Sequence, residues 1–273
     1  MSSFLIYLSF SVNESKDFSE GGPLKATAKY FVILTVVLLL ISCAAGNKTE
    51  KKDRALIIEE HFQLAYNAAA RGNLVEAVTE YQKVLKLDSK NAKAHLNLGI
   101  VYGRQEKWKK EISQYEKAID ADPNFAEAHF NLGVAYQGRG KLKKAKSQYQ
   151  RALQIYPNYV EAHTNLGIIH FRQGRFDQAL EEYQKTIEIK PDYAKGYYNI
   201  GSVHRQQKKM EEAIASFQKA LEINPKYAAA HYALGVTYYE KQEFKLAIEH
   251  FDQAEKLGMV VDPKLLERLK TYR

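Results

Sequence analysis

Cysteine is almost absent from the chain, which has one among 273 residues. A single cysteine excludes an intrachain disulfide framework and any zinc or iron–sulfur site that needs several cysteines. Six prolines and 15 glycines are too few for a fibrous or low-complexity protein. The excess of positive charge, 40 basic against 32 acidic residues, is small and does not by itself indicate nucleic acid binding. The remaining composition, 45% hydrophobic and 26% charged, is that of an ordinary folded protein.

Long hydrophobic runs are also lacking, apart from one of twelve residues at 30–41 (YFVILTVVLLLI). A helix needs about 20 apolar residues to span a bilayer, so this run is short for a membrane span. Its length suits the central region of a secretory signal, and Lys25 and Lys29 supply the basic flank. The only cysteine, Cys43, follows the run after one small residue, Ser42.

The segment 40–43 (Leu-Ile-Ser-Cys) resembles the bacterial lipobox. That resemblance implies a diacylglyceryl group on the sulfur of Cys43 and cleavage of the chain just before it. We therefore expect residues 1–42 to be a signal region and residues 43–57 to be the lipidated cysteine and a polar tether. The alternative is an uncleaved, single-pass signal anchor whose remaining chain organises a membrane complex.

The 29 residues before the apolar run are many for a secretory signal. Our hypothesis is that translation begins at Leu24 from a non-standard start codon. Residues 24–42 would then be the signal peptide, and residues 1–23 would carry no function. A TTG codon at Leu24 permits this hypothesis, and CTC or CTT excludes it.

Glycines recur with a constant spacing of 34 residues, at Gly99, Gly133, Gly167, Gly201 and Gly235. A fixed period of this size predicts a solenoid of stacked units. Aligned on these glycines, six units cover residues 58–261: 58–91, 92–125, 126–159, 160–193, 194–227 and 228–261.

Positions within each unit follow a two-helix pattern. Positions 4, 7, 8 and 11 share one helical face, a second periodic stretch runs from position 17 to 27, and proline at position 32 ends the second helix in four units. Each unit is therefore predicted to be helix, turn, helix. Because glycine inside a helix costs about 1 kcal/mol relative to alanine, the glycines at position 8 indicate close approach of a second helix.

These positions resemble the tetratricopeptide repeat, with Leu-Gly at 7–8, tyrosine at 11, alanine at 20 and 27, an aromatic residue at 24 and proline at 32. The resemblance implies an all-α, right-handed superhelical solenoid of six helix pairs. Residues 262–273 are expected to form a C-terminal capping helix over the last apolar face. Position 4 departs from the family in carrying histidine in five units: His61, His95, His129, His163 and His231.

We interpret this histidine column as packing. Neighbouring units would separate the rings by on the order of 10 Å, whereas a metal needs ligands within about 2.0–2.2 Å of one centre. The chain also lacks a recognisable catalytic triad, nucleophile elbow or glycine-rich phosphate loop. We therefore expect no enzymatic activity, no catalytic residues, no cofactor or metal, and no small-molecule substrate.

Asparagine at position 6 is the strongest functional signal. It occurs in four consecutive units, as Asn97, Asn131, Asn165 and Asn199, on a stripe expected to be exposed on the inner face. The column resembles the asparagine ladder of the O-GlcNAc transferases, which implies contact with the main chain of an extended peptide. The alternative is that these amides link neighbouring helices. Charged neighbours proposed to bind the same peptide are Lys93, Arg172, Lys195 and Arg205.

Other partners receive less support. Position 5 carries no lysine, so the carboxylate clamp that binds chaperone tails is not supported. The basic run of Lys141, Lys143, Lys144 and Lys146 is interpreted as a solvated face, with an anionic partner or lipid headgroups as the alternative. Nucleic acid is not an expected partner.

Together these features predict a non-enzymatic scaffold on the periplasmic side of a bacterial envelope membrane, held there by lipid on Cys43 and binding a protein or extended peptide. Resemblance to envelope lipoproteins with such repeats implies secretion, pilus, protease or cell-wall machinery as partners. Ala44 lacks the aspartate that retains many lipoproteins at the inner membrane, which favours the outer membrane.

Overall fold

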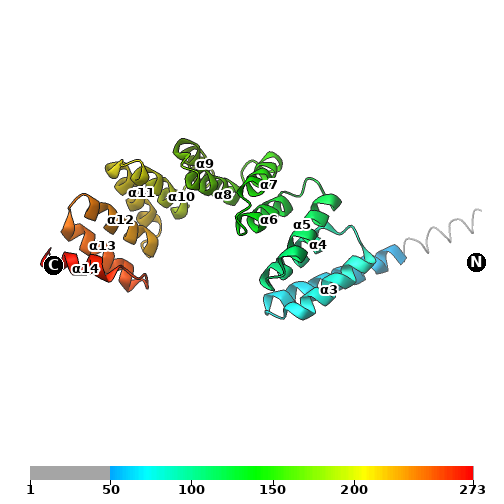
Figure 1. The fold of residues 1–273 in the computed structure, drawn as a ribbon. Helices are drawn as coiled ribbons and strands as arrows, with labels where there is room; N and C mark the ends of the chain where they lie inside the picture. The colour runs from blue at the N-terminus through cyan, green and yellow to red at the C-terminus, as the bar shows by residue number, and fades with distance from the viewer. Residues whose placement is uncertain (1–49, 273) are drawn as a thin grey trace, which may run out of the picture. The chain divides into compact units, whose positions relative to one another are not determined.

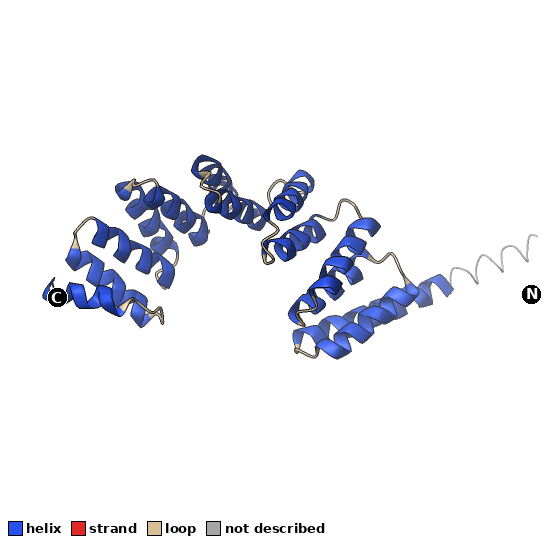
Figure 2. Cartoon of the chain, in the orientation of Figure 1, coloured by secondary structure: helices blue, strands red, loops and turns tan. Residues whose placement is uncertain are grey.

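The computed structural model describes residues 50–272, and within this range all regular secondary structure is helical (Figure 2). The first described helix covers residues 50–70. The others are α3 (Leu74–Leu87), α4 (Ala92–Arg104), α5 (Trp108–Ala121), α6 (Ala126–Gln137), α7 (Leu142–Ile155), α8 (Val160–Arg172), α9 (Phe176–Ile189), α10 (Ala194–Gln206), α11 (Met210–Ile223), α12 (Ala228–Glu240), α13 (Phe244–Lys256), α14 (Pro263–Leu269) and the short 3₁₀ helix η1 (Lys270–Tyr272).

The helices pack as successive pairs (Figure 1). From α4 to α13, each first helix contacts the second helix of its own pair most extensively, as α8 does with α9. Each second helix from α3 to α11 also contacts the first helix of the next pair. The predicted all-α solenoid of helix pairs is confirmed. Below, "first helices" are α4, α6, α8, α10 and α12, and "second helices" are α3, α5, α7, α9, α11 and α13.

The glycine at position 8 allows the two helices of a pair to touch. A Cβ built on Gly167 would lie 2.5 Å from Cε1 of Tyr183, a separation that real Cβ atoms do not show. The same relation links Gly99 to Tyr115 and Gly235 to Phe251. The close approach predicted from these glycines is confirmed, and its partner is the aromatic ring at position 24.

The last pair is covered by the predicted capping segment. Asp262 is the N-cap residue of α14, and its side chain accepts a hydrogen bond of 2.9 Å from the backbone N–H of Lys264. Leu269 is then buried in one cluster with Leu234 and Phe251. The capping segment therefore completes the last apolar face.

The predicted signal region, with Cys43, lies outside the described residues. Residues 50–57 of the predicted tether are helical, because the helix 50–70 begins before the first predicted unit. Between residues 50 and 272, no helix combines the length and the apolar character that crossing a bilayer requires.

Candidate functional site

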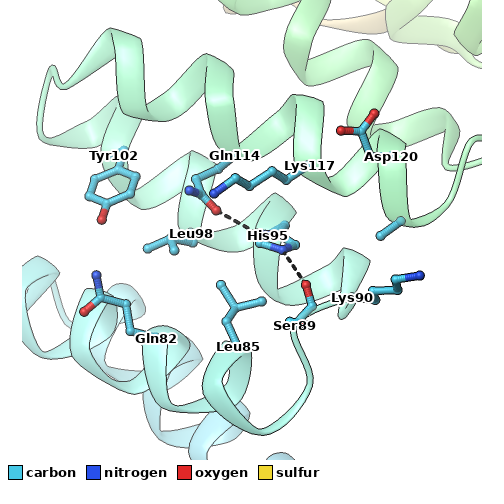
Figure 3. A pocket seen from close by; sticks show the side chains of 11 residues that line it. Gln82, Leu85, Ser89, Lys90, His95, Leu98, Tyr102, Gln114, Lys117 and Asp120 are labelled. Carbon is cyan, nitrogen blue, oxygen red and sulfur yellow. Dashed lines mark hydrogen bonds between the residues drawn. The ribbon is translucent and has the colours of Figure 1, made fainter.

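The position-4 histidines form hydrogen bonds at the junctions between pairs. In Figure 3, Nδ1 of His95 lies 2.7 Å from Oε1 of Gln114, and its Nε2 lies 3.1 Å from the carbonyl oxygen of Ser89. Gln114 belongs to the second helix of the same pair, and Ser89 lies in the loop that ends the preceding pair. Because the carbonyl can only accept, Nε2 of His95 carries the proton. One side chain thus joins three segments.

The same arrangement recurs along the chain. His129 lies 2.7 Å from Gln148 and 3.2 Å from the carbonyl oxygen of Pro123. His231 lies 3.1 Å from the carbonyl oxygen of Pro225, and its Nδ1 lies 3.1 Å from Nδ1 of His250. These histidines are structural, as predicted, but they act through directed hydrogen bonds as well as through packing.

A pocket of about 490 Å³ lies beside His95, between Leu85, Lys90 and Lys117 (Figure 3). A second pocket, of about 360 Å³, lies beside His163 and uses the equivalent Lys185. In both pockets the two imidazole nitrogens of the histidine already have partners. The pockets therefore offer no free imidazole for acid–base chemistry.

Two of the four ladder asparagines are held in one orientation. Nδ2 of Asn97 donates to the carbonyl oxygen of Lys93 at 2.9 Å, and Nδ2 of Asn131 donates to that of Glu127 at 2.8 Å. Both bonds reach back one turn of the same helix, and both side chains are half-buried. Neither Oδ1 accepts a hydrogen bond from another described residue, so each remains available as an acceptor.

The other two ladder asparagines differ from this pair. Nδ2 of Asn165 contacts the hydroxyl of Tyr149 on α7 at 3.4 Å, which is the interhelix link of the alternative interpretation. Asn199 is buried, with 8% of its surface exposed, and its Nδ2 has no partner. The expectation of an exposed column is therefore wrong at Asn199. We attribute this burial to the direct packing of α10 against α12, the next first helix.

The predicted charged neighbours are distributed along the first helices. Lys93, Arg172 and Lys195 are exposed. Arg205 instead forms an ion pair with Glu240, with Nη1 lying 3.1 Å from Oε1. Three of the four cations are therefore free to meet an acidic ligand, and the fourth already has a carboxylate.

Aromatic rings at position 5 support the ladder. Tyr198 lies between Phe217 and Tyr227, with ring centroids 5.7 and 5.2 Å apart, and Phe130 packs on Tyr159 at 4.8 Å. Burial, together with the nearby Tyr198, raises the pKa of Tyr227 to about 12, so this ring is neutral at physiological pH. Both Phe130 and Tyr198 are half-buried, which leaves an apolar edge next to the asparagines.

Among residues 50–272, no three histidine, cysteine or acidic side chains lie close enough together to hold a metal ion. The arrangement that the structure does provide is a repeated polar and aromatic surface along the first helices. Such a surface can bind a polypeptide.

Several solved structures share this fold. The MamA protein is 31% identical over a match that covers 63% of this chain and 94% of that chain, with a TM-score of 0.55. PilF of Pseudomonas aeruginosa is 18% identical over a match that covers 81% of this chain and 100% of that chain, with a TM-score of 0.69. YrrB is described as a TPR protein with an unusual peptide-binding site. It is 22% identical over a match that covers 70% of this chain and 97% of that chain, with a TM-score of 0.56. PilF and YrrB, at these identities, show the shared fold alone.

No match was found among curated proteins. Models of protein families identify the repeats directly from the sequence. The TPR repeat model matches residues 68–106, 104–140 and 201–242. Two models of the tetratricopeptide repeat match residues 124–192 and 228–257. These matches together span more than half of the chain, which therefore belongs to the tetratricopeptide repeat family.

Proposed function

We propose that the protein is a non-enzymatic scaffold that binds an extended segment of a partner polypeptide along its first helices. The observation that carries this proposal is the fixed orientation of Asn97 and Asn131. Each uses its N–H to bond its own helix, and no residue of the range 50–272 donates to its Oδ1. These oxygens can accept hydrogen bonds from backbone N–H groups, which every residue of a polypeptide except proline provides.

Preorganisation favours this use of the asparagines. A side chain already held in place loses little conformational freedom when a ligand binds, so more of the hydrogen-bond energy appears as affinity. The half-buried rings of Phe130 and Tyr198 supply apolar contact beside the amides. The exposed Lys93, Arg172 and Lys195 favour acidic side chains in the bound segment. The peptide-binding site named for YrrB supports the same use of this fold.

The second part of the proposal concerns location. The lipobox-like segment 40–43 supports acylation of Cys43, which would hold the repeats on the periplasmic side of a bacterial envelope membrane. Metabolic labelling with a fatty acid tests this directly. Loss of the label in Cys43→Ser supports the lipid anchor on this cysteine. Label that survives the substitution contradicts the anchor, because the fatty acid is then attached at another residue.

Peptide binding is tested by crosslinking and capture from native envelope membranes. The test variant is Asn97→Ala with Asn131→Ala, and a second variant carries alanine at Asn165 and Asn199. The matched control replaces two exposed carboxamides of second helices, Gln150→Ala with Gln184→Ala. Circular dichroism checks that each variant remains folded.

We expect the Asn97 and Asn131 variant to lose the partner that the wild type captures, and the glutamine control to retain it. Loss in the Asn165 and Asn199 variant as well would extend the site along α8 and α10. Equal capture by the wild type and every variant would contradict the proposal and make the whole column structural.

A further inference from the structure

Trp108 lies exposed at the start of α5, with 58% of its surface accessible to solvent. It is the only tryptophan in the chain. Residues 106–110 (EKWKK), which form the turn into α5, are all exposed around it. A single exposed indole is not by itself a binding site, so its meaning depends on the charge that surrounds it.

The charge around this residue is concentrated. The turn segments 104–111 and 138–146 together hold nine basic and two acidic residues, a net charge of +7. The whole chain has a net charge of +8. Nearly all of the protein's net charge therefore lies in the turns of two consecutive helix pairs.

The structure joins these two turns through Arg139. Its guanidinium carbon lies 5.5 Å from the centre of the Trp108 ring. Its Nη2 lies 2.7 Å from Oε2 of Glu111, and its Nη1 donates to the carbonyl oxygen of Ala135 at 2.6 Å. The two segments therefore form one continuous surface, here called the basic edge.

Lysines of the basic edge are available for a ligand. Lys107, Lys109, Lys141 and Lys143 are exposed, and none forms an ion pair with a described residue. A hollow beside Trp108 is shallow and is lined by residues 106–110 themselves. A set of projecting lysines around one indole, without a groove, fits a broad anionic surface better than a single extended chain.

We infer that the basic edge binds the surface of an anionic phospholipid membrane, with Trp108 at the level of the headgroups. Indole rings favour the membrane–water interface, where one side is apolar and the other is wet. Each lysine near an anionic membrane adds electrostatic attraction, which salt screens. This contact needs no acyl group on Cys43, so it is separate from the proposed anchor.

The single tryptophan provides the test. The full chain is added to vesicles of phosphatidylcholine, with and without about one third phosphatidylglycerol. Trp108 emission and its quenching by lipids brominated in the acyl chain are recorded. The test variant carries glutamine at Lys107, Lys109, Lys141 and Lys143. The control removes the same charge from four exposed lysines elsewhere by glutamine substitution at Lys208, Lys209, Lys226 and Lys245.

We expect Trp108 emission to shift to the blue and to be quenched only in the anionic vesicles. The test variant should need at least about tenfold more anionic lipid for the same shift, and the control should behave as the wild type. Raising the salt to about 0.5 M should reverse the shift.

Other outcomes would overturn the inference. If aqueous iodide still quenches Trp108 emission in the presence of anionic vesicles, the inference is contradicted, even if another part of the chain attaches to the lipid. A blue shift produced by polyglutamate but not by anionic vesicles assigns the edge to an acidic protein. A shift produced by inorganic phosphate alone assigns it to a small anion. Because fatty acid labelling tests Cys43 separately, failure of the anchor and failure of the basic edge are distinguishable.

Discussion

Nδ1 of His163 lies 2.6 Å from Oε2 of Glu182, while its Nε2 lies 2.9 Å from the carbonyl oxygen of Pro157. The carbonyl oxygen can only accept, so Nε2 of His163 donates to it. Through these two contacts His163 joins α8, α9 and the loop that ends the preceding pair of helices. At the equivalent place Nδ1 of His61 lies 2.6 Å from Oε2 of Glu80, whereas His95 and His129 meet neutral glutamines, so the partner is a carboxylate in two units and a carboxamide in two others.

Replacing Glu182 by glutamine should reproduce the neutral contact at a measurable cost. Burial raises the pKa of Glu182, but the hydrogen bond from His163 and the charge of Lys185 outweigh it and hold the pKa below its ordinary value. A carboxylate with a lowered pKa stabilises the fold above its unfolded pKa and loses that contribution as the pH falls through its folded pKa. We expect Glu182→Gln to lower the free energy of unfolding by about 1 kcal/mol at neutral pH.

Denaturant unfolding at a series of pH values measures this effect. The difference between wild type and Glu182→Gln should shrink as the pH falls below the unfolded value of 4.5. The control is Glu181→Gln, because Glu181 is exposed and its ion pair with Lys185 should contribute little. A difference independent of pH would contradict a stabilising role for the ionised carboxylate of Glu182.

The last pair of helices should be sensitive to mild acid. His250 faces the imidazole of His231 and has Glu249 beside it, and the ring of Tyr238 stacks on it. Burial, followed by the charge of His231, lowers the pKa of His250 below 6.5. The folded state therefore binds fewer protons than the unfolded state below this pH, and stability falls as the solution is acidified.

His250→Gln places here the residue that pairs with His95 and His129 elsewhere. Between about pH 7.5 and 5.5, we expect the wild type to lose on the order of 1 kcal/mol more stability than the variant. Thermal unfolding followed by circular dichroism at both pH values measures this. Parallel losses in the two proteins would show that this histidine pair does not control the acid response.

Gly167→Ala should destabilise the protein although alanine is the better helix former. The added methyl would meet Cε1 of Tyr183 at 2.5 Å, and overpacking of this kind costs about 1–3 kcal/mol. Gly138→Ala is the control, because its Cβ would meet only a backbone atom at 3.6 Å. Chemical denaturation should show a loss for the first variant and a change within about 0.5 kcal/mol for the second. Equal stability of both variants would mean that the helices separate easily.

Much of the fold can be predicted from the sequence because each unit repeats the same residue types at the same positions. The glycine at position 8 specifies both a helix and the partner that must approach it, and the contact of Gly167 with Tyr183 bears this out. Because six units can be aligned, a residue type that recurs at one position is distinguished from a chance occurrence. The sequence does not place the start of the helix 50–70, because residues 50–54 are all charged and residues 50–57 precede the first repeated unit.

The hydrogen bonds of the histidines were not foreseen, although the sequence contains a signal for them. Position 23 is polar in every unit, and where position 4 changes from histidine to Tyr197, position 23 changes to Ser216. The burial of Asn199 had no comparable signal. It depends on how closely α10 and α12 pack, and the departures of this unit from its neighbours, such as Tyr197 at position 4, do not by themselves indicate a buried asparagine.

Site-specific photocrosslinking tests the central claim most directly. A photoreactive residue is placed in living cells at Val134, which is 41% exposed and lies one turn after Asn131 on α6. The comparison site is Gln150, exposed on the second helix α7. A polypeptide held along the first helices predicts an adduct at Val134 that disappears when Asn97 and Asn131 are replaced by alanine. Adducts at Gln150 alone, or an adduct at Val134 that persists in the alanine variant, would contradict binding through these asparagines.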